Sequence, residues 1–273
     1  MPLRFAALTF VLSLATGPIA VASIEMKFDE VGPNGGVSAN LAFNGDSVAA
    51  RIGQMFFHAR NQSGAPVLDL IDGPDSDTAL NDLVSFCIEP AQYVSGSWKT
   101  YSKTPVANAP DPFISGAPGG YHIGQHRASA LDLLADNFWG RATGSNVVDA
   151  VAFQLSVWEI VHEGLSGSLS DPPLAGSWSV SDNQGTFFVS NDNPGSSLAG
   201  AIQTANDWLA EVSAFYDNDV NTTSSLSHND QLSLVALTNP DWQDQIVQYH
   251  LPEPVSAVVW GGLMAFCVCR RQR

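Results

Sequence analysis

Residues 149–163 read DAVAFQLSVWEIVHE, and this stretch decides the fold of the middle of the chain. Apolar side chains recur at the spacing that places them on one face of an α-helix, at Val147, Val151, Trp158 and Val161. The remaining position on that face is Gln154. The opposite face is also apolar, so the sequence predicts a helix that is buried nearly all round. Burying a carboxamide without partners costs about 1–3 kcal/mol, so another group must bond to Gln154 or react with it.

A candidate partner for Gln154 lies upstream, in residues 83–90, which read LVSFCIEP. Their β-branched and aromatic content predicts a buried strand that ends at Pro90. The strand contains Cys87, the one cysteine between residues 23 and 250. A single cysteine in that range excludes an internal disulfide framework. The sequence therefore offers one thiol and one buried carboxamide as a potential pair.

These two segments resemble the thioester domains of bacterial surface adhesins. In that family, a strand cysteine and the glutamine of a Thr-Gln-x-Ala-aliphatic-Trp motif join through their side chains and release ammonia. The resemblance implies a cross-link between Cys87 and Gln154, with aromatic neighbours that exclude water, namely Phe86, Phe153 and Trp158. Phe153 stands where the family has threonine, and Ser156 stands where it has alanine.

The N-terminal segment has the features of a secretory signal peptide. Arg4 is followed by an apolar run from Phe5 to Ala15 and then by Ala20-Val21-Ala22. We expect residues 1–22 to be removed and the rest to be exported. A lone thiol in an exported protein is open to oxidation unless it is buried or capped, and reaction with Gln154 would cap it.

The C-terminal segment, residues 251–273, resembles the PEP-CTERM sorting signal. It contains Pro252, Glu253 and Pro254, then an apolar run over residues 255–269, then a basic end. The resemblance implies that an exosortase recognises the tail and passes the protein to the cell surface or extracellular matrix, with a transient or permanent anchor in the inner membrane. The arginines suit the cytoplasmic side. The apolar run is shorter than the about 20 residues of an ordinary membrane helix.

The charge of the chain excludes some classes of partner. The chain has 27 acidic and 11 basic residues, a formal net charge of −16, and it has no lysine or arginine between Arg141 and Arg270. Binding to nucleic acid or to an anionic membrane surface requires basic patches, so we expect neither. No metal-ligand spacing is diagnostic either, so we expect no cofactor and treat the acidic segments 72–77 and 217–221 as turns.

The exported part, residues 23–250, is long enough for one large or two small domains. Its many Gly, Ser, Asn and Asp residues favour short strands and turns, so we predict an α+β fold: a β-rich ectodomain, sandwich-like or barrel-like, with a helical insert over 124–163. Strands are expected within 24–57, broken at 32–36 and 44–46, and at 54–60, 83–90, 232–237 and 245–251. Residues 93–118 are expected to form a loop with edge strands at most. Helices are expected at 124–139, after an N-cap at Asn146 or Ser145, and at 197–216, and a hairpin at 178–189.

The predicted function follows from the chemistry of a thioester, an acyl group that is activated toward amines. A primary amine on a partner, from a protein lysine or a polyamine, would attack the carbonyl carbon of Gln154, leave an amide and free the Cys87 thiol. The protein would react once, as an adhesin, and would not be a turnover enzyme. His122, His126 and His162 are candidates for a local base, and a histidine without a chemical role is the alternative for each.

Two other functions remain open from the sequence. In the first, Cys87 is an ordinary buried thiol, Gln154 is hydrogen-bonded, and the protein is a passive component of the extracellular matrix or biofilm. In the second, Cys87 is the nucleophile of a cysteine peptidase or a transglutaminase-like enzyme. That enzyme would need an electropositive site such as a helix N-terminus, and a strand followed by Glu89 does not supply one.

Overall fold

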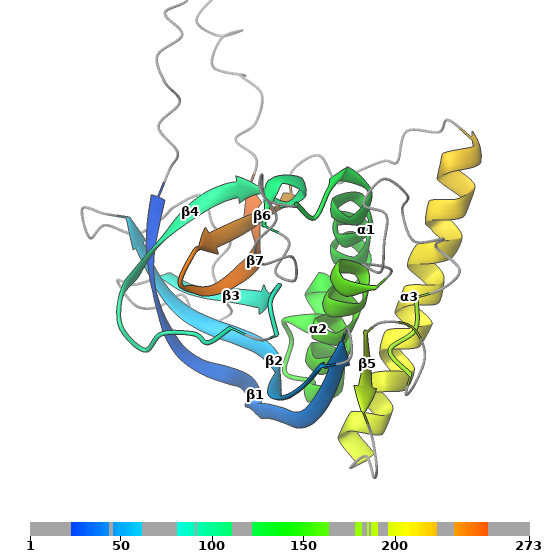
Figure 1. Ribbon diagram of the computed structural model, residues 1–273, viewed down its shortest axis with the longest axis horizontal. Helices are drawn as coiled ribbons and strands as arrows, with labels where there is room; N and C mark the ends of the chain where they lie inside the picture. The colour runs from blue at the N-terminus through cyan, green and yellow to red at the C-terminus, as the bar shows by residue number, and fades with distance from the viewer. Residues whose placement is uncertain are drawn as a thin grey trace, which may run out of the picture.

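The computed structural model describes residues 23–43, 46–61, 81–90, 92–110, 122–163, 178–181, 185, 187–190, 196–222 and 232–250. The predicted signal peptide, the predicted sorting tail and the acidic segment 72–77 lie outside this part of the chain. Figure 1 shows a ring of strands with α-helices packed along one side. This arrangement confirms the α+β class. None of the helices in the described ranges is both long enough and apolar enough to cross a membrane.

The strands form an antiparallel sheet that closes on itself. The hydrogen-bonded order is β2-β3-β7-β6-β4-β1-β5, and β1 also pairs with β2, so the first six strands of that order make a ring. The strands are β1 (Ser23–Phe43), β2 (Asp46–Asn61), β3 (Asn81–Cys87), β4 (Lys99–Pro105), β5 (Phe187–Ser190), β6 (Leu232–Asn239) and β7 (Trp242–His250). Closure pairs both sides of each strand in the ring, so this part of the chain is barrel-like.

The long strand β1 corrects one prediction. The chain does not leave the sheet at residues 32–36. Instead, the β1–β2 register jumps from Gly32 opposite Gln54 to Val37 opposite Ile52, which makes a wide bulge. Gly35 and Gly36 adopt φ values of 78° and 66°, which glycine reaches without strain. The break predicted at 44–46 agrees with the strand ends, since β1 ends at Phe43, β2 begins at Asp46 and these two residues pair; residues 44 and 45 lie outside the described part of the chain.

The segment 93–118 corrects a second prediction, because it contains β4 as an interior strand of the ring. β4 pairs with β1 on one side and with β6 on the other. Its Tyr101 is only 1% exposed. β4 was not predicted as an interior strand because polar residues occupy its outer positions, so its local sequence resembles that of a loop. A short 3₁₀ helix, η1 (Val106–Asn108), follows it.

The helices are α1 (Gln125–Ala142), α2 (Val147–His162) and α3 (Ser196–Thr222). All three were predicted, and α1 and α3 extend farther at their C-terminal ends than expected. α1 continues past Gly140, because one exposed glycine costs a helix only about 1 kcal/mol. The backbone of α3 stays helical through residues 217–221, which were predicted as a turn. In the predicted hairpin, Val189 N donates to Val180 O at 3.2 Å, but only β5 is a strand and it pairs with β1.

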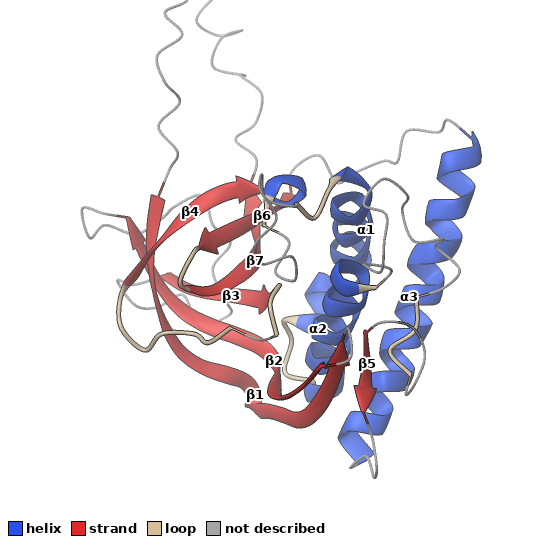
Figure 2. Cartoon of the chain, viewed as in Figure 1, coloured by secondary structure: helices blue, strands red, loops and turns tan. Residues whose placement is uncertain are grey.

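Helix α2 lies between the barrel and the other helices. It contacts β1, β2 and β3 on one side and α1 and α3 on the other, as Figures 1 and 2 show. Every residue from Asp149 to Glu163 is buried, which confirms that α2 is enclosed nearly all round. Packing of Phe138 against Trp208, with ring centroids 4.5 Å apart, holds α1 to α3.

Candidate functional site

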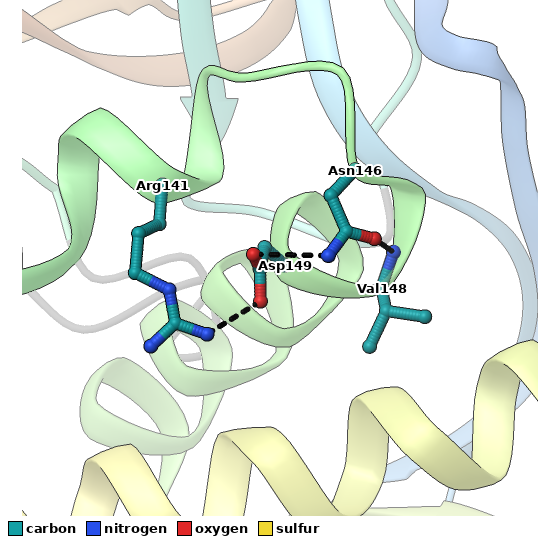
Figure 3. A network of polar contacts seen from close by, with 4 residues as sticks. All are labelled: Arg141, Asn146, Val148 and Asp149. Atoms are coloured by element: carbon teal, nitrogen blue, oxygen red, sulfur yellow. Dashed lines mark hydrogen bonds and ion pairs between the residues drawn. The ribbon is translucent and has the colours of Figure 1, made fainter.

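The position of α2 is fixed at its N-terminus by a small polar network, shown in Figure 3. Asn146 is the N-cap, and its Oδ1 accepts a hydrogen bond from Val148 N at 3.0 Å. Asn146 Nδ2 donates to Asp149 Oδ2 at 3.1 Å, and Arg141 Nη2 reaches Asp149 Oδ1 at 2.9 Å. These contacts tie the start of α2 to the end of α1, which confirms Asn146 as the predicted cap. They also set the rotation of α2 and with it the direction of Gln154.

Gln154 lies directly against Cys87. Cys87 N donates to Gln154 Oε1 at 2.8 Å, and Gln154 Nε2 donates to Cys87 O at 2.8 Å. Both residues are 0% exposed. The carboxamide thus occupies the place that the peptide group of a neighbouring strand would take, since β3 ends here. The structure brings together the two residues that the sequence predicted as a pair.

Phe86 and Phe153, the chain neighbours of Cys87 and Gln154, belong to a cluster of aromatic rings. The rings of Phe86 and Phe153 have centroids 4.5 Å apart, and the ring of Trp139 meets both edge-on. Trp158, one helical turn beyond Gln154, is 1% exposed. Of the three aromatic residues predicted as the pocket, Phe86 and Phe153 pack against each other, and Trp158 lines the same cavity as Cys87. Trp139 was missed, because an aromatic residue on an amphipathic helix has the pattern of ordinary core.

The chain after Cys87 is held rigidly by β7 and by the end of α2. Ile88 N donates to Asp244 O at 2.9 Å, and Asp244 N donates to Glu89 Oε2 at 3.1 Å. Gln243 Nε2 also donates to Glu89 O. Burial, together with the nearby charge of Glu89, raises the pKa of Asp244 to about 8. This pair of buried carboxyl groups was not predicted, because Glu89 and Asp244 are far apart in the sequence.

The three histidines that were candidates for a local base do not gather around the Cys87 sulfur. His162 Nε2 donates to Ile88 O at 2.9 Å, and burial lowers the pKa of His162 to about 3, so its imidazole is neutral and a weak base. His122 and His126 are exposed, at the entry to α1. Among the described residues, no group of His, Cys, Asp and Glu side chains has the arrangement of a metal site.

The environment of Cys87 favours the neutral thiol. Burial raises the pKa of Cys87 well above its ordinary value, and the charge of Glu89 acts in the same direction. A cysteine peptidase needs the opposite, a thiolate stabilised by positive charge. The geometry therefore gives no support to the peptidase alternative. A group with a raised pKa is also a poor leaving group as an anion, which protects a bond to its sulfur.

A cavity of about 260 Å³ connects Cys87 to the surface. Cys87 and Trp158 line its inner end, and the other walls come from Val31 in β1, residues 48–51 and Met55 in β2, residues 90 and 92–94 after β3, and Gln243 in β7. The bulge in β1 lies beside this cavity. The cavity could not be predicted from the sequence, because five separate segments form it.

Comparison of the chain with protein-family models, with curated proteins and with solved structures finds no match. The assignment of function therefore rests on the geometry of Cys87, Gln154 and the cavity that leads to them.

Proposed function

We propose that the protein is an exported surface adhesin that carries an internal thioester between Cys87 and Gln154 and binds amines on a partner covalently. The observation that carries this proposal is the contact just described: a buried carboxamide held by two 2.8 Å hydrogen bonds against the backbone of a buried cysteine. The cavity that ends at that cysteine supports it, since it brings open space up to a thiol that is itself 0% exposed.

The contact prepares Gln154 for attack by the thiol. The hydrogen bond from Cys87 N to Gln154 Oε1 polarises the side-chain carbonyl and can stabilise the negative charge that develops on that oxygen. The Cys87 sulfur adds to the carbonyl carbon, the C–N bond breaks, and the thiol proton leaves with the amide nitrogen as ammonia. One thiol and one carboxamide become one thioester and one ammonia, so no oxidant or cofactor is required.

The second step consumes the thioester. A neutral primary amine enters through the cavity and attacks the same carbonyl carbon. The C–S bond breaks, the amine proton passes to sulfur, and Gln154 is left joined to the partner by an amide. Since the Cys87 pKa is raised, sulfur leaves readily only as the protonated thiol, and the amine supplies that proton. Water is a poorer nucleophile than an amine, and the burial of Cys87 and Gln154 limits its access.

The two ends of the chain suit this function. The signal peptide predicted at 1–22 would export the protein, and the tail predicted at 251–273 would be recognised by an exosortase and retained at the cell surface or matrix through residues 255–269. The tail begins directly after β7, which ends at His250.

One observation favours a second candidate function, the passive matrix protein. Both polar atoms of the Gln154 carboxamide already have hydrogen-bond partners, so Gln154 can serve as a structural peg between α2 and β3 without any reaction. The two functions differ by one covalent bond, and the measurement of that bond decides between them.

The test is the intact mass of the mature protein after export. We expect the measured mass to be lower than the mass calculated from the sequence by one ammonia, and we expect Cys87→Ala to show its full calculated mass. Methylamine should add its own mass to the wild-type protein at Gln154 and release a thiol that titrates. If the wild-type protein has its full mass and its thiol titrates before any amine is added, the thioester is absent and the passive matrix function is the one that remains.

Two matched variants test whether Gln154 is the residue that loses ammonia. Gln154→Glu, which has no ammonia to lose, should show no deficit. The same change at Gln125, the exposed first residue of α1, should keep the deficit and the reaction with methylamine.

A further inference from the structure

The walls of the cavity restrict which amine can reach the thioester. The described lining residues are mostly apolar, and Arg51 is the one among them that carries a full charge. At about 260 Å³, the cavity is slightly smaller than the about 300–1,000 Å³ of sites for drug-sized ligands. It therefore suits a single unbranched side chain with an amine at its end.

Arg51 is held at the mouth of the cavity. Its side chain is exposed, and its Nε donates to the carbonyl oxygen of Gly35 in the β1 bulge. Gly35 has φ 78°, and a Cβ there would lie 2.8 Å from an Arg51 nitrogen, so the glycine leaves room for the guanidinium. A fixed positive charge at the mouth repels an amine that carries further positive charges and attracts one with a carboxylate nearby.

Tyr93 indicates the kind of molecule that bears the amine. It also lines the cavity, and it is 84% exposed. Large aromatic side chains presented in this way are common anchors in protein–protein contacts. A free polyamine would gain little from Tyr93, whereas a polypeptide that presents a lysine would cover it.

We propose that the amine is the lysine side chain of a protein partner, with an aspartate or glutamate beside it that pairs with Arg51. The inference rests on the proposed thioester and adds its specificity. An acidic group on the partner is the opposite of what the overall charge of the chain would suggest, since a net charge of −16 would favour a basic partner. At physiological ionic strength, charges farther than about 8 Å are screened, so the charge at the mouth decides.

The experiment compares three blocked peptides, Asp-Lys-Asp, Ser-Lys-Ser and Arg-Lys-Arg, with methylamine and spermidine as further probes. The rate at which each adds to the mature protein is followed by intact mass. We expect the acidic peptide to react about two- to fivefold faster than the neutral one, the range that an exposed ion pair gives, and the basic peptide and spermidine to be slowest. In Arg51→Gln this order should collapse.

Lys27→Gln is the matched control, because it removes the same charge from β1 at a position that does not line the cavity. It should keep the wild-type order. A wild-type protein that reacts fastest with the basic peptide or spermidine, or an order that survives in Arg51→Gln, would overturn the inference while leaving the thioester intact. Absence of reaction with methylamine as well would instead overturn the proposed function.

Discussion

If the thioester forms, opening it should lower the stability of the fold by an amount that the structure allows us to estimate. Cys87 and Gln154 are 67 residues apart in the chain, so a bond between them closes a long loop. In the chain-entropy model used for disulfides, a cross-link across a loop of this length stabilises the folded state by about 4 kcal/mol. The cross-link also has a local cost. Gln154 loses Nε2 as ammonia, so Cys87 O loses its hydrogen-bond donor, which costs about 1 kcal/mol.

The expected net effect is about 3 kcal/mol in favour of the closed form. For a domain of this size, each kcal/mol shifts the melting temperature by about 2–4 °C, so the closed form should melt roughly 6–12 °C higher. Ammonia is the appropriate reagent for opening the bond, because it restores the native carboxamide at Gln154 and adds no new group. The two samples then differ only in the cross-link, and intact mass verifies each state before and after the thermal scan.

The same ammonia treatment of Cys87→Ala should leave its melting temperature unchanged, which controls for the solvent. Closed and ammonia-opened wild-type proteins that melt within about 2 °C of each other would refute the reasoning, since no loop constraint of the expected size would then exist.

Three further predictions concern α2. Burial raises the pKa of Glu159 to about 9 from an ordinary 4.5, so this group stabilises the fold most below pH 4.5 and loses that contribution as the pH rises toward 9. Glu159→Gln should therefore be more stable than wild type in urea by about 3 kcal/mol at pH 7 and equal to it near pH 4.5. Glu211→Gln, on the exposed face of α3, is the control and should match the wild-type stability at both pH values. A stability difference between Glu159→Gln and wild type that does not vary with pH would contradict the prediction. Trp158→Phe removes part of the wall over Cys87, so it should destabilise the fold by about 1–3 kcal/mol and speed hydrolysis of the thioester, seen as a faster gain of one water in mass; unchanged hydrolysis would mean that Trp158 does not exclude water. Asn146→Ala removes the cap of α2 and should lower the free energy of unfolding by about 1 kcal/mol in urea, while Ser145→Ala, one residue earlier, should change little.

The helix that carries Gln154 was predictable because its signal is local. Fourteen consecutive buried positions leave a continuous apolar pattern, and one carboxamide in that pattern stands out. Cys87 was found for a similar reason, since it is a single reactive side chain in an apolar strand. The pairing itself came from a resemblance to a family, and no rule of spacing along one chain would have joined residues 67 positions apart.

The features that were missed depend on contacts between distant segments. Closure of the barrel depends on β1 pairing with both β2 and β4, and a break was predicted where the chain only bulges. The cavity combines residues from β1, β2, β7 and the loop after β3, so no local pattern marks it. The charge of Arg51 looked like ordinary surface charge until the bulge placed it at the mouth.

The closed ring also has a mechanical consequence. β7 runs between β3 and β6 and ends at His250, so a tensile load applied at the C-terminal end of the domain would be shared between two neighbouring strands. β3 carries Cys87 at its last position, and Cys87 itself pairs with Gln245 of β7. Under the proposed function, drag on a bound partner would therefore be transmitted into the same strands that present Cys87, with no free sheet edge in the ring from which peeling could begin.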